Sequence, residues 1–148
     1  MPKDYYECRA WLESFIPLVW GKEELGLRRI ENLLEKLKNP QKKFKSVLVA
    51  GTAGKGSTAF YISQLLRVSG KKVGLHVSPH LVDLRERMQI NGKLIPMKRF
   101  IGLVNQIKPV VDDIIAKQPS QTPSYFEILV ALSFLYFAKE KVNFAVIE

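Results

Sequence analysis

The segment from Val47 to Thr58 constrains this chain more than any other feature. It reads V-L-V-A-G-T-A-G-K-G-S-T, so an apolar, β-branched run leads into a glycine-rich loop with a lysine and hydroxyls, and a helical pattern follows. Glycines allow positive φ and bring successive N–H groups toward phosphate oxygens. The following helix directs its positive dipole end at the same place. The segment therefore predicts a strand, a phosphate-binding loop and a helix that starts near Ser57.

This loop departs from the common pattern G-x-x-x-x-G-K-[S/T]. The first glycine of that pattern is replaced by Val49, and Gly56 separates Lys55 from Ser57. Lys55 can still supply a point charge, and Ser57 or Thr58 can reach a phosphate or its magnesium ion. A glycine-rich connector with a solvated Lys55 is the alternative, but the strand-to-helix context favours phosphate binding.

Length and composition indicate one globular domain with a core of useful size, since the chain has 148 residues. A single cysteine, Cys8, excludes an internal disulfide framework and is typical of a reducing cytoplasm. The longest apolar stretch, residues 128–138, is too short to span a bilayer, and the N-terminus lacks the pattern of a secretory signal. We therefore expect a cytoplasmic protein without a membrane partner.

The net charge of +9 indicates an anionic partner or a bare basic surface. The basic residues form two groups in the sequence: Lys36, Lys38, Lys42, Lys43 and Lys45, and Arg85, Arg87, Lys93, Lys98 and Arg99. Neither group alternates with stacking aromatics or matches a nucleic-acid motif. A nucleoside triphosphate and a substrate with several carboxylates would account for the same excess, and a solvated basic face remains open for residues 36–45. We expect no nucleic acid.

Hydrophobic periodicity and turn residues predict the elements. Helices are expected at residues 5–18, 25–37, 57–70, 97–117 and 124–141, and strands at 46–50, 72–77 and 143–148. Asn91 and Gly92 between apolar residues predict a β-hairpin. Pro17 should end the first helix, Pro109 should kink or divide the fourth, and Ser124 with Glu127 forms a capping box that opens the fifth.

Strands that alternate with helices predict an α/β layered domain with a mainly parallel sheet. The last strand is apolar and ends in Glu148. An acidic residue at such a strand end is typical of the magnesium-binding carboxylate of nucleotide-hydrolysing folds, in which a loop and a helix follow. We therefore interpret residues 1–148 as the N-terminal part of a longer protein.

Three segments together resemble the folylpolyglutamate synthase and dihydrofolate synthase family, which is part of the Mur-ligase-like superfamily of ATP-dependent amide ligases. Residues 51–58 are similar to the family's G-T-N-G-K-G-S/T loop. Residues 78–81 (S-P-H-L), 86–88 (E-R-M) and 90–92 (I-N-G) resemble its S-P-H-L, E-R-I and N-G segment. Residues 124–127 (S-Y-F-E) and 145–148 (A-V-I-E) resemble its T-x-F-E helix start and V-x-L-E strand, and residues 25–30 its L-G-L-x-R-I helix. The resemblance covers nearly the whole chain but only about the first third of a family member.

This resemblance implies ATP-dependent ligation of L-glutamate to a folate carboxylate through an acyl phosphate, with ATP and Mg²⁺ bound here. Lys55 would be the catalytic cation, and Ser78 and Glu148 would ligate magnesium. The ATP phosphates would be held by Gly51, Thr52, Ala53, Gly54, Lys55, Gly56, Ser57 and Thr58. Ala53 replaces the family's asparagine, which removes one side-chain hydrogen bond and keeps the backbone cradle.

The resemblance also implies a pterin pocket lined by Leu25, Ser124, Tyr125, Phe126 and Glu127. Ser124 replaces the family's threonine, and the capping box is an equally good reading of the 124–127 segment. Glu23 and Glu24 occupy the place of a pterin-contacting pair, which departs from the family pattern. The acceptor stays open between dihydropteroate, a reduced folate or both.

By the same resemblance, a C-terminal domain absent from these 148 residues closes over ATP and helps to bind glutamate, and the full-length enzyme is a monomer. The alternative reading is a P-loop phosphotransferase or nucleotide switch of another family, which requires a hydroxyl directly after the lysine and leaves the S-P-H-L segment unexplained. A basic nucleic-acid-binding module rests on charge alone and predicts steep salt dependence.

Overall fold

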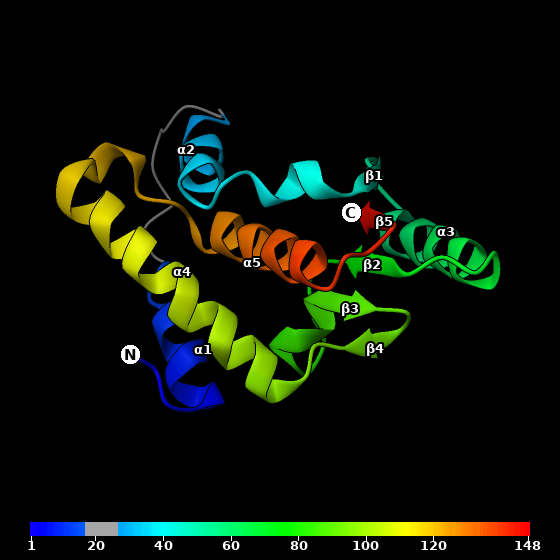
Figure 1. The fold of residues 1–148 in the computed structure, drawn as a ribbon, viewed down its shortest axis with the longest axis horizontal. Coiled ribbons are helices and arrows are strands. Elements are labelled where there is room, and N and C mark those ends of the chain that lie inside the picture. Colours follow the sequence, from blue (N-terminus) through cyan, green and yellow to red (C-terminus); the bar gives the residue numbers. More distant parts are fainter. Residues whose placement is uncertain (17–26) are drawn as a thin grey trace. The chain divides into compact units, whose positions relative to one another are not determined.

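The computed structural model describes residues 1–16 and 27–148 and divides the chain into two compact units. Unit 1 consists of Met1–Pro40 and Met97–Leu132, and unit 2 of Gln41–Pro96 and Ser133–Glu148. The division falls within helix α5 (Tyr125–Lys139), whose N-terminal half belongs to unit 1 and whose C-terminal half belongs to unit 2 (Figure 1).

Unit 1 is helical in the part that the structure describes. Helices α1 (Tyr5–Glu13) and α2 (Arg28–Lys36) both pack against α4 (Met97–Lys117), and a 3₁₀ turn, η4 (Pro119–Gln121), follows α4. One face of α4 is apolar at helical spacing and buried, comprising Phe100, Leu103, Val104, Ile107, Val111 and Ile114. This face provides the core of unit 1, because burial of an amphipathic stripe stabilises a helix more than its intrinsic propensity does.

One predicted helix boundary in unit 1 differs from the structure, and another lies outside the described residues. The predicted end of the first helix is wrong: α1 stops at Glu13, where the Ser14 hydroxyl donates to the carbonyl of Trp11 at 2.6 Å. The predicted start of the second helix, Leu25, lies outside the described residues, and the described part of α2 begins at Arg28. Pro109 does not divide α4, since packing on the buried face continues through it and compensates for the lost backbone hydrogen bond.

Unit 2 contains a five-stranded sheet in the order β1-β5-β2-β3-β4. The strands β1 (Lys45–Leu48), β5 (Phe144–Ile147) and β2 (Val73–His76) are parallel, whereas β3 (Met88–Ile90) and β4 (Lys93–Leu94) form an antiparallel edge beside β2. The hairpin turn has Asn91 at φ 50° and Gly92 at φ 75°, as a two-residue type I′ turn requires. The expected α/β class is confirmed, and the sheet is mixed: its three predicted strands are parallel, with limits within two residues of the prediction, and the hairpin adds an antiparallel edge.

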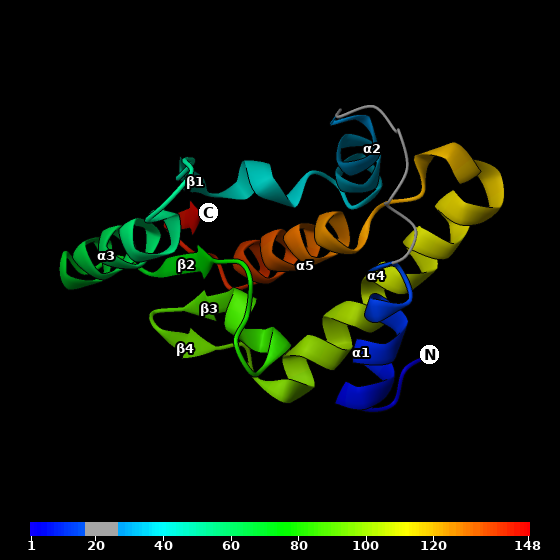
Figure 2. The same ribbon diagram turned by 180° about the vertical axis from the view of Figure 1, so that it is seen from behind.

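Helices pack on the sheet of unit 2 (Figure 2). Helix α3 (Lys55–Val68) packs on β2 and β5 through a buried cluster of Ala59, Val73, Leu75 and Val146. The C-terminal half of α5 brings Phe137 against Gly74, where an added Cβ would lie 2.6 Å from the ring. Because β1, β5 and β2 are parallel, their carboxyl ends meet at one edge of the sheet, which is where open α/β sheets bind ligands.

Helix α5 is buried along most of its length, as its apolar sequence predicts. Its fully buried side chains include Ile128, Leu129, Ala131, Leu132 and Phe137. Among residues 1–16 and 27–148, no helix combines the length and the apolar character needed to cross a bilayer.

Candidate functional site

The glycine loop joins β1 to α3 in unit 2. Gly54 is the N-cap of α3 and adopts the left-handed conformation at φ 74°, and Gly51 has φ 154°. The helix begins at Lys55, two residues earlier than predicted, because the carbonyl of Gly54 accepts from both the amide (3.0 Å) and the hydroxyl (2.9 Å) of Thr58. The hydrogen of the Thr58 hydroxyl is thus used inside the helix, and Ser57 offers a second exposed hydroxyl in the same turn.

The carboxylate of Glu148 lies beside the first turn of α3. A Cβ built on Gly56 would lie 3.6 Å from its Oε2, an ordinary van der Waals contact that places the carboxylate against this turn. Oε2 also accepts from the amide of Ser78 at 3.0 Å, and the amide of Glu148 donates to the carbonyl of His76 at 3.0 Å. The structure therefore brings the ends of β5 and β2 together with the phosphate loop around one carboxylate.

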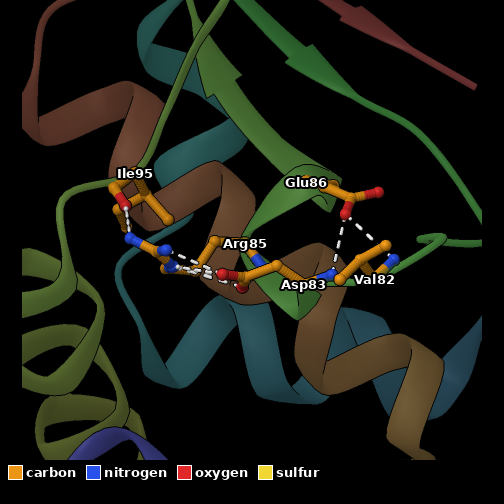
Figure 3. A network of polar contacts seen from close by, with 5 residues as sticks. All are labelled: Val82, Asp83, Arg85, Glu86 and Ile95. Carbon is orange, nitrogen blue, oxygen red and sulfur yellow. Dashed lines mark hydrogen bonds and ion pairs between the residues drawn. The ribbon is translucent and has the colours of Figure 1, made fainter.

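The segment after Ser78 is ordered by a second carboxylate, Glu86. It accepts from the amides of Leu81 (2.8 Å), Val82 (3.0 Å) and Asp83 (2.7 Å) and completes a capping box with Asp83. Arg85 pairs with Asp83 at 2.7 Å and also reaches the carbonyl of Ile95, as Figure 3 shows. Hydrogen bonds from the amides of Leu81 and Asp83 lower the pKa of Glu86. The motif resemblance alone does not predict this role of Glu86, whereas the D-x-x-E spacing from Asp83 to Glu86 is the local signal for the cap.

Two histidines flank Ser78. His76 is fully buried, and its Nδ1 lies 2.7 Å from the hydroxyl of Ser133. Burial lowers the pKa of His76 to about 4, and the charge of Arg87 acts in the same direction. Arg87 donates from Nε to Nδ1 of His80 at 2.9 Å. Since a guanidinium only donates, His80 is the tautomer with its proton on Nε2.

The residues expected to bind the acceptor lie in unit 1. The capping box of α5 is confirmed: Ser124 donates its amide to Glu127 at 2.7 Å, and the amide of Glu127 reaches the hydroxyl of Ser124 at 3.2 Å. Arg29 adds an ion pair to Glu127 at 3.2 Å. Tyr125 is half-buried and Phe126 remains 46% exposed, whereas Leu25 lies outside the described residues. Phe126 is thus the apolar side chain that this segment presents to solvent.

The groups around the glycine loop fit a magnesium–triphosphate ligand. The loop offers the amides of the first turn of α3, the cation of Lys55 and a hydroxyl, and the adjacent Glu148 and Ser78 offer hard oxygen donors. Among the described residues, no three His, Cys, Asp or Glu side chains lie close enough together to hold a metal ion. Magnesium commonly keeps water and phosphate oxygens as its remaining ligands, so two protein donors suffice.

In this mixed sheet, the first of three parallel strands leads through a glycine loop and a lysine into a helix, and a carboxylate ends the neighbouring strand. These features define a P-loop-type nucleotide-binding α/β unit. No protein-family model matches the sequence. The dihydrofolate synthase/folylpolyglutamate synthase of Bacillus subtilis (strain 168) is 39% identical over 145 residues, which are 97% of this chain and 33% of that protein. The dihydrofolate synthetase of Saccharomyces cerevisiae is 37% identical over 125 residues, 84% of this chain and 28% of that protein.

Solved structures give the same result. The folylpolyglutamate synthetase from Lactobacillus casei superposes with a TM-score of 0.88 at 34% identity, covering 98% of this chain and 36% of that one. The folylpolyglutamate synthase from Thermotoga maritima superposes with a TM-score of 0.82 at 37% identity, covering 95% and 33%. The chain is a homologue of the N-terminal part of the folylpolyglutamate synthase and dihydrofolate synthase family, and it spans about a third of the length of these relatives.

Proposed function

We propose that this chain is the ATP-binding part of a ligase that joins L-glutamate to a folate carboxylate. The relatives carry the names of such enzymes. A structure titled "FPGS-AMPPCP-folate complex" superposes with a TM-score of 0.87 at 34% identity, and the Mycobacterium tuberculosis folylpolyglutamate synthase with ADP gives 0.88 at 32%. A nucleotide and a folate are therefore the ligands to test on this chain.

The observation that carries the proposal is the position of Glu148 beside the glycine loop. Its carboxylate lies next to Gly56 and holds the amide of Ser78, so a metal bound by Glu148 and Ser78 would also adjoin phosphates held by the loop and Lys55. Mg²⁺ bound there would neutralise charge on the transferring phosphoryl group. The alternative, in which the glycine loop is only a solvated connector, does not explain why a carboxylate lies beside it.

The chemistry follows from the acceptor. A carboxylate is a poor electrophile, so its phosphorylation by ATP to an acyl phosphate supplies a leaving group, and the amine of glutamate then displaces phosphate. Lys55 and the amides of the loop stabilise negative charge on the transferring group without reorganising. Phe126, exposed at the start of α5, together with Ser124, Tyr125, Glu127 and Leu25, would contact the acceptor, which is dihydropteroate, a reduced folate or both.

Residues 1–148 are, in this proposal, the N-terminal portion of the ATP-binding domain, and the rest of that domain and a second domain complete the enzyme as a cytoplasmic monomer. Closure of a second domain excludes water and aligns the amine. The 148-residue chain is therefore expected to bind a nucleotide weakly and to form no amide.

A chimera tests the proposal: residues 1–148 replace the aligned third of the Bacillus subtilis relative, which is 39% identical. We expect ATP- and Mg²⁺-dependent incorporation of labelled glutamate into dihydropteroate or tetrahydrofolate, and none with Lys55→Ala. Binding of AMPPCP to the 148-residue chain is measured in parallel, so that a chimera that fails to fold does not decide the result. Nucleotide binding without glutamate transfer in a folded chimera would favour the alternative, a phosphotransferase or nucleotide switch.

A further inference from the structure

His76 and Ser133 form a buried polar pair at the C-terminal end of β2. His76 is the last residue of β2 and Ser133 lies on α5, and both are 0% exposed. His76 Nδ1 and Ser133 Oγ are 2.7 Å apart. Two buried polar groups are costly compared with an apolar pair of the same shape, and each becomes more costly when the other is removed. A packing role alone would be served equally well by apolar side chains.

The backbone of His76 contacts the candidate metal site. The carbonyl of His76 accepts from the amide of Glu148 at 3.0 Å, and two residues later the amide of Ser78 donates to Oε2 of Glu148 at 3.0 Å. The carboxylate of Glu148 thus depends on the backbone from His76 to Ser78 for both of these contacts. The side chain on this backbone, the imidazole of His76, lies 2.7 Å from the hydroxyl of Ser133 on α5.

We propose that His76 and Ser133 are positioning residues for Glu148 and Ser78, an inference that rests on the proposed function of these two as ligands of Mg²⁺. The bond ties the end of β2 to α5 and sets where the Ser78 amide and the Glu148 carboxylate lie beside the glycine loop. Metal sites depend on outer partners of this kind, because donors must be held close to their binding geometry. The imidazole does not touch the ligand and transfers no proton in this role.

Three variants of the 148-residue chain separate positioning from stability. Ser133→Ala leaves His76 without this bond and is expected both to destabilise unit 2 and to weaken metal binding. His76→Leu combined with Ser133→Ala replaces both polar partners and is expected to recover most of the stability, but not the metal binding. Ser63→Ala is the matched control, since Ser63 is 4% exposed and its hydroxyl bonds the carbonyl of Phe60 at 2.7 Å within α3.

The first measurement is the affinity for AMPPCP with saturating Mg²⁺ and with EDTA. We expect the gain in affinity from Mg²⁺ to fall about tenfold in Ser133→Ala and in the double variant, while affinity in EDTA stays within twofold in all variants. Ser63→Ala should keep the full gain. A double variant that is stable and retains the gain would overturn the proposal, because a role in stability alone predicts that result.

The second measurement is amide hydrogen exchange at Ser78 and Glu148, and it needs no ligand. Both amides should exchange at least tenfold faster in Ser133→Ala and in the double variant, while the amides of β5 inside the sheet keep their protection in the double variant. If wild-type protein shows no Mg²⁺-dependent binding, the proposed function fails and this measurement still decides whether the pair positions the strand ends. Unchanged exchange at Ser78 and Glu148 in the double variant would refute it.

Discussion

Replacement of Gly74 by alanine is expected to destabilise unit 2 by about 2 kcal/mol. The added Cβ would lie 2.6, 2.7 and 2.8 Å from Cδ1, Cγ and Cε1 of Phe137. Nonbonded carbons prefer about 3.5 to 4.0 Å, so the ring would have to move by about 1 Å. Phe137 is 0% exposed and its ring centroid lies 6.0 Å from those of Phe44 and Tyr136, which restrict that movement.

The magnitude follows from two opposing effects. Overpacking of a buried site costs about 1 to 3 kcal/mol, and three close contacts to a Cβ fixed by the backbone place this case at about 3 kcal/mol. Alanine restricts the unfolded chain more than glycine does, which offsets about 0.5 to 1 kcal/mol. The remainder is the expected loss of about 2 kcal/mol.

Urea unfolding gives the free energy change, and hydrogen exchange of β5 amides assigns it to unit 2. Gly102→Ala is the control, because nothing lies within 4 Å of a Cβ added at Gly102 in α4, and it should stabilise by about 1 kcal/mol. Phe137→Leu in the Gly74→Ala background should relieve the overlap, giving a coupling energy of at least about 1 kcal/mol. Gly74→Ala within about 0.5 kcal/mol of wild type, or strict additivity with Phe137→Leu, would refute the overlap argument.

Three further predictions concern other parts of the chain. Lys55→Ala should weaken AMPPCP binding at least tenfold in calorimetry without lowering the melting temperature, and unchanged binding would contradict the phosphate-loop assignment. Cys8 is 0% exposed, and burial, then Asp4 and Glu7, raise its pKa from 9.0 to about 11. At pH 8 its thiolate fraction is about 100-fold below that of a free thiol. Ellman's reagent should therefore react with Cys8 about 100-fold more slowly in the folded protein than in urea, and faster as the pH rises toward 11. Equal rates in the folded protein and in urea would show that unit 1 is open. Ser124→Ala should cost about 1 kcal/mol in thermal unfolding and Ser124→Thr much less, since the threonine keeps the capping hydroxyl; equal losses would argue against the cap.

Several features were predictable because their signals lie within a few neighbouring residues. The glycine loop, the hairpin turn at Asn91 and Gly92, and the capping box of Ser124 with Glu127 each depend on the local backbone conformation or on bonds across three residues. The alternation of strands and helices similarly predicted the α/β class, because each element's period of burial is present in its own sequence.

Local signals were insufficient where other segments compete with them. Pro109 should break a helix by its own chemistry, yet α4 continues, since its buried face packs on both sides of the proline. The end of α1 at Glu13 depends on a bond from Ser14 to Trp11, which the apolar periodicity of residues 5–18 does not reveal.

The sequence by itself determined that a glycine-rich loop with a lysine joins a strand to a helix, and that an acidic residue ends a later strand. The tertiary structure decided that Glu148 lies beside Gly56 and holds the amide of Ser78, and that Ser133 reaches His76 across 57 positions of sequence. Such pairs depend on strand order, register and the depth at which a helix packs. These are set by burial of apolar surface throughout the unit, which is non-directional and is not a property of any one segment.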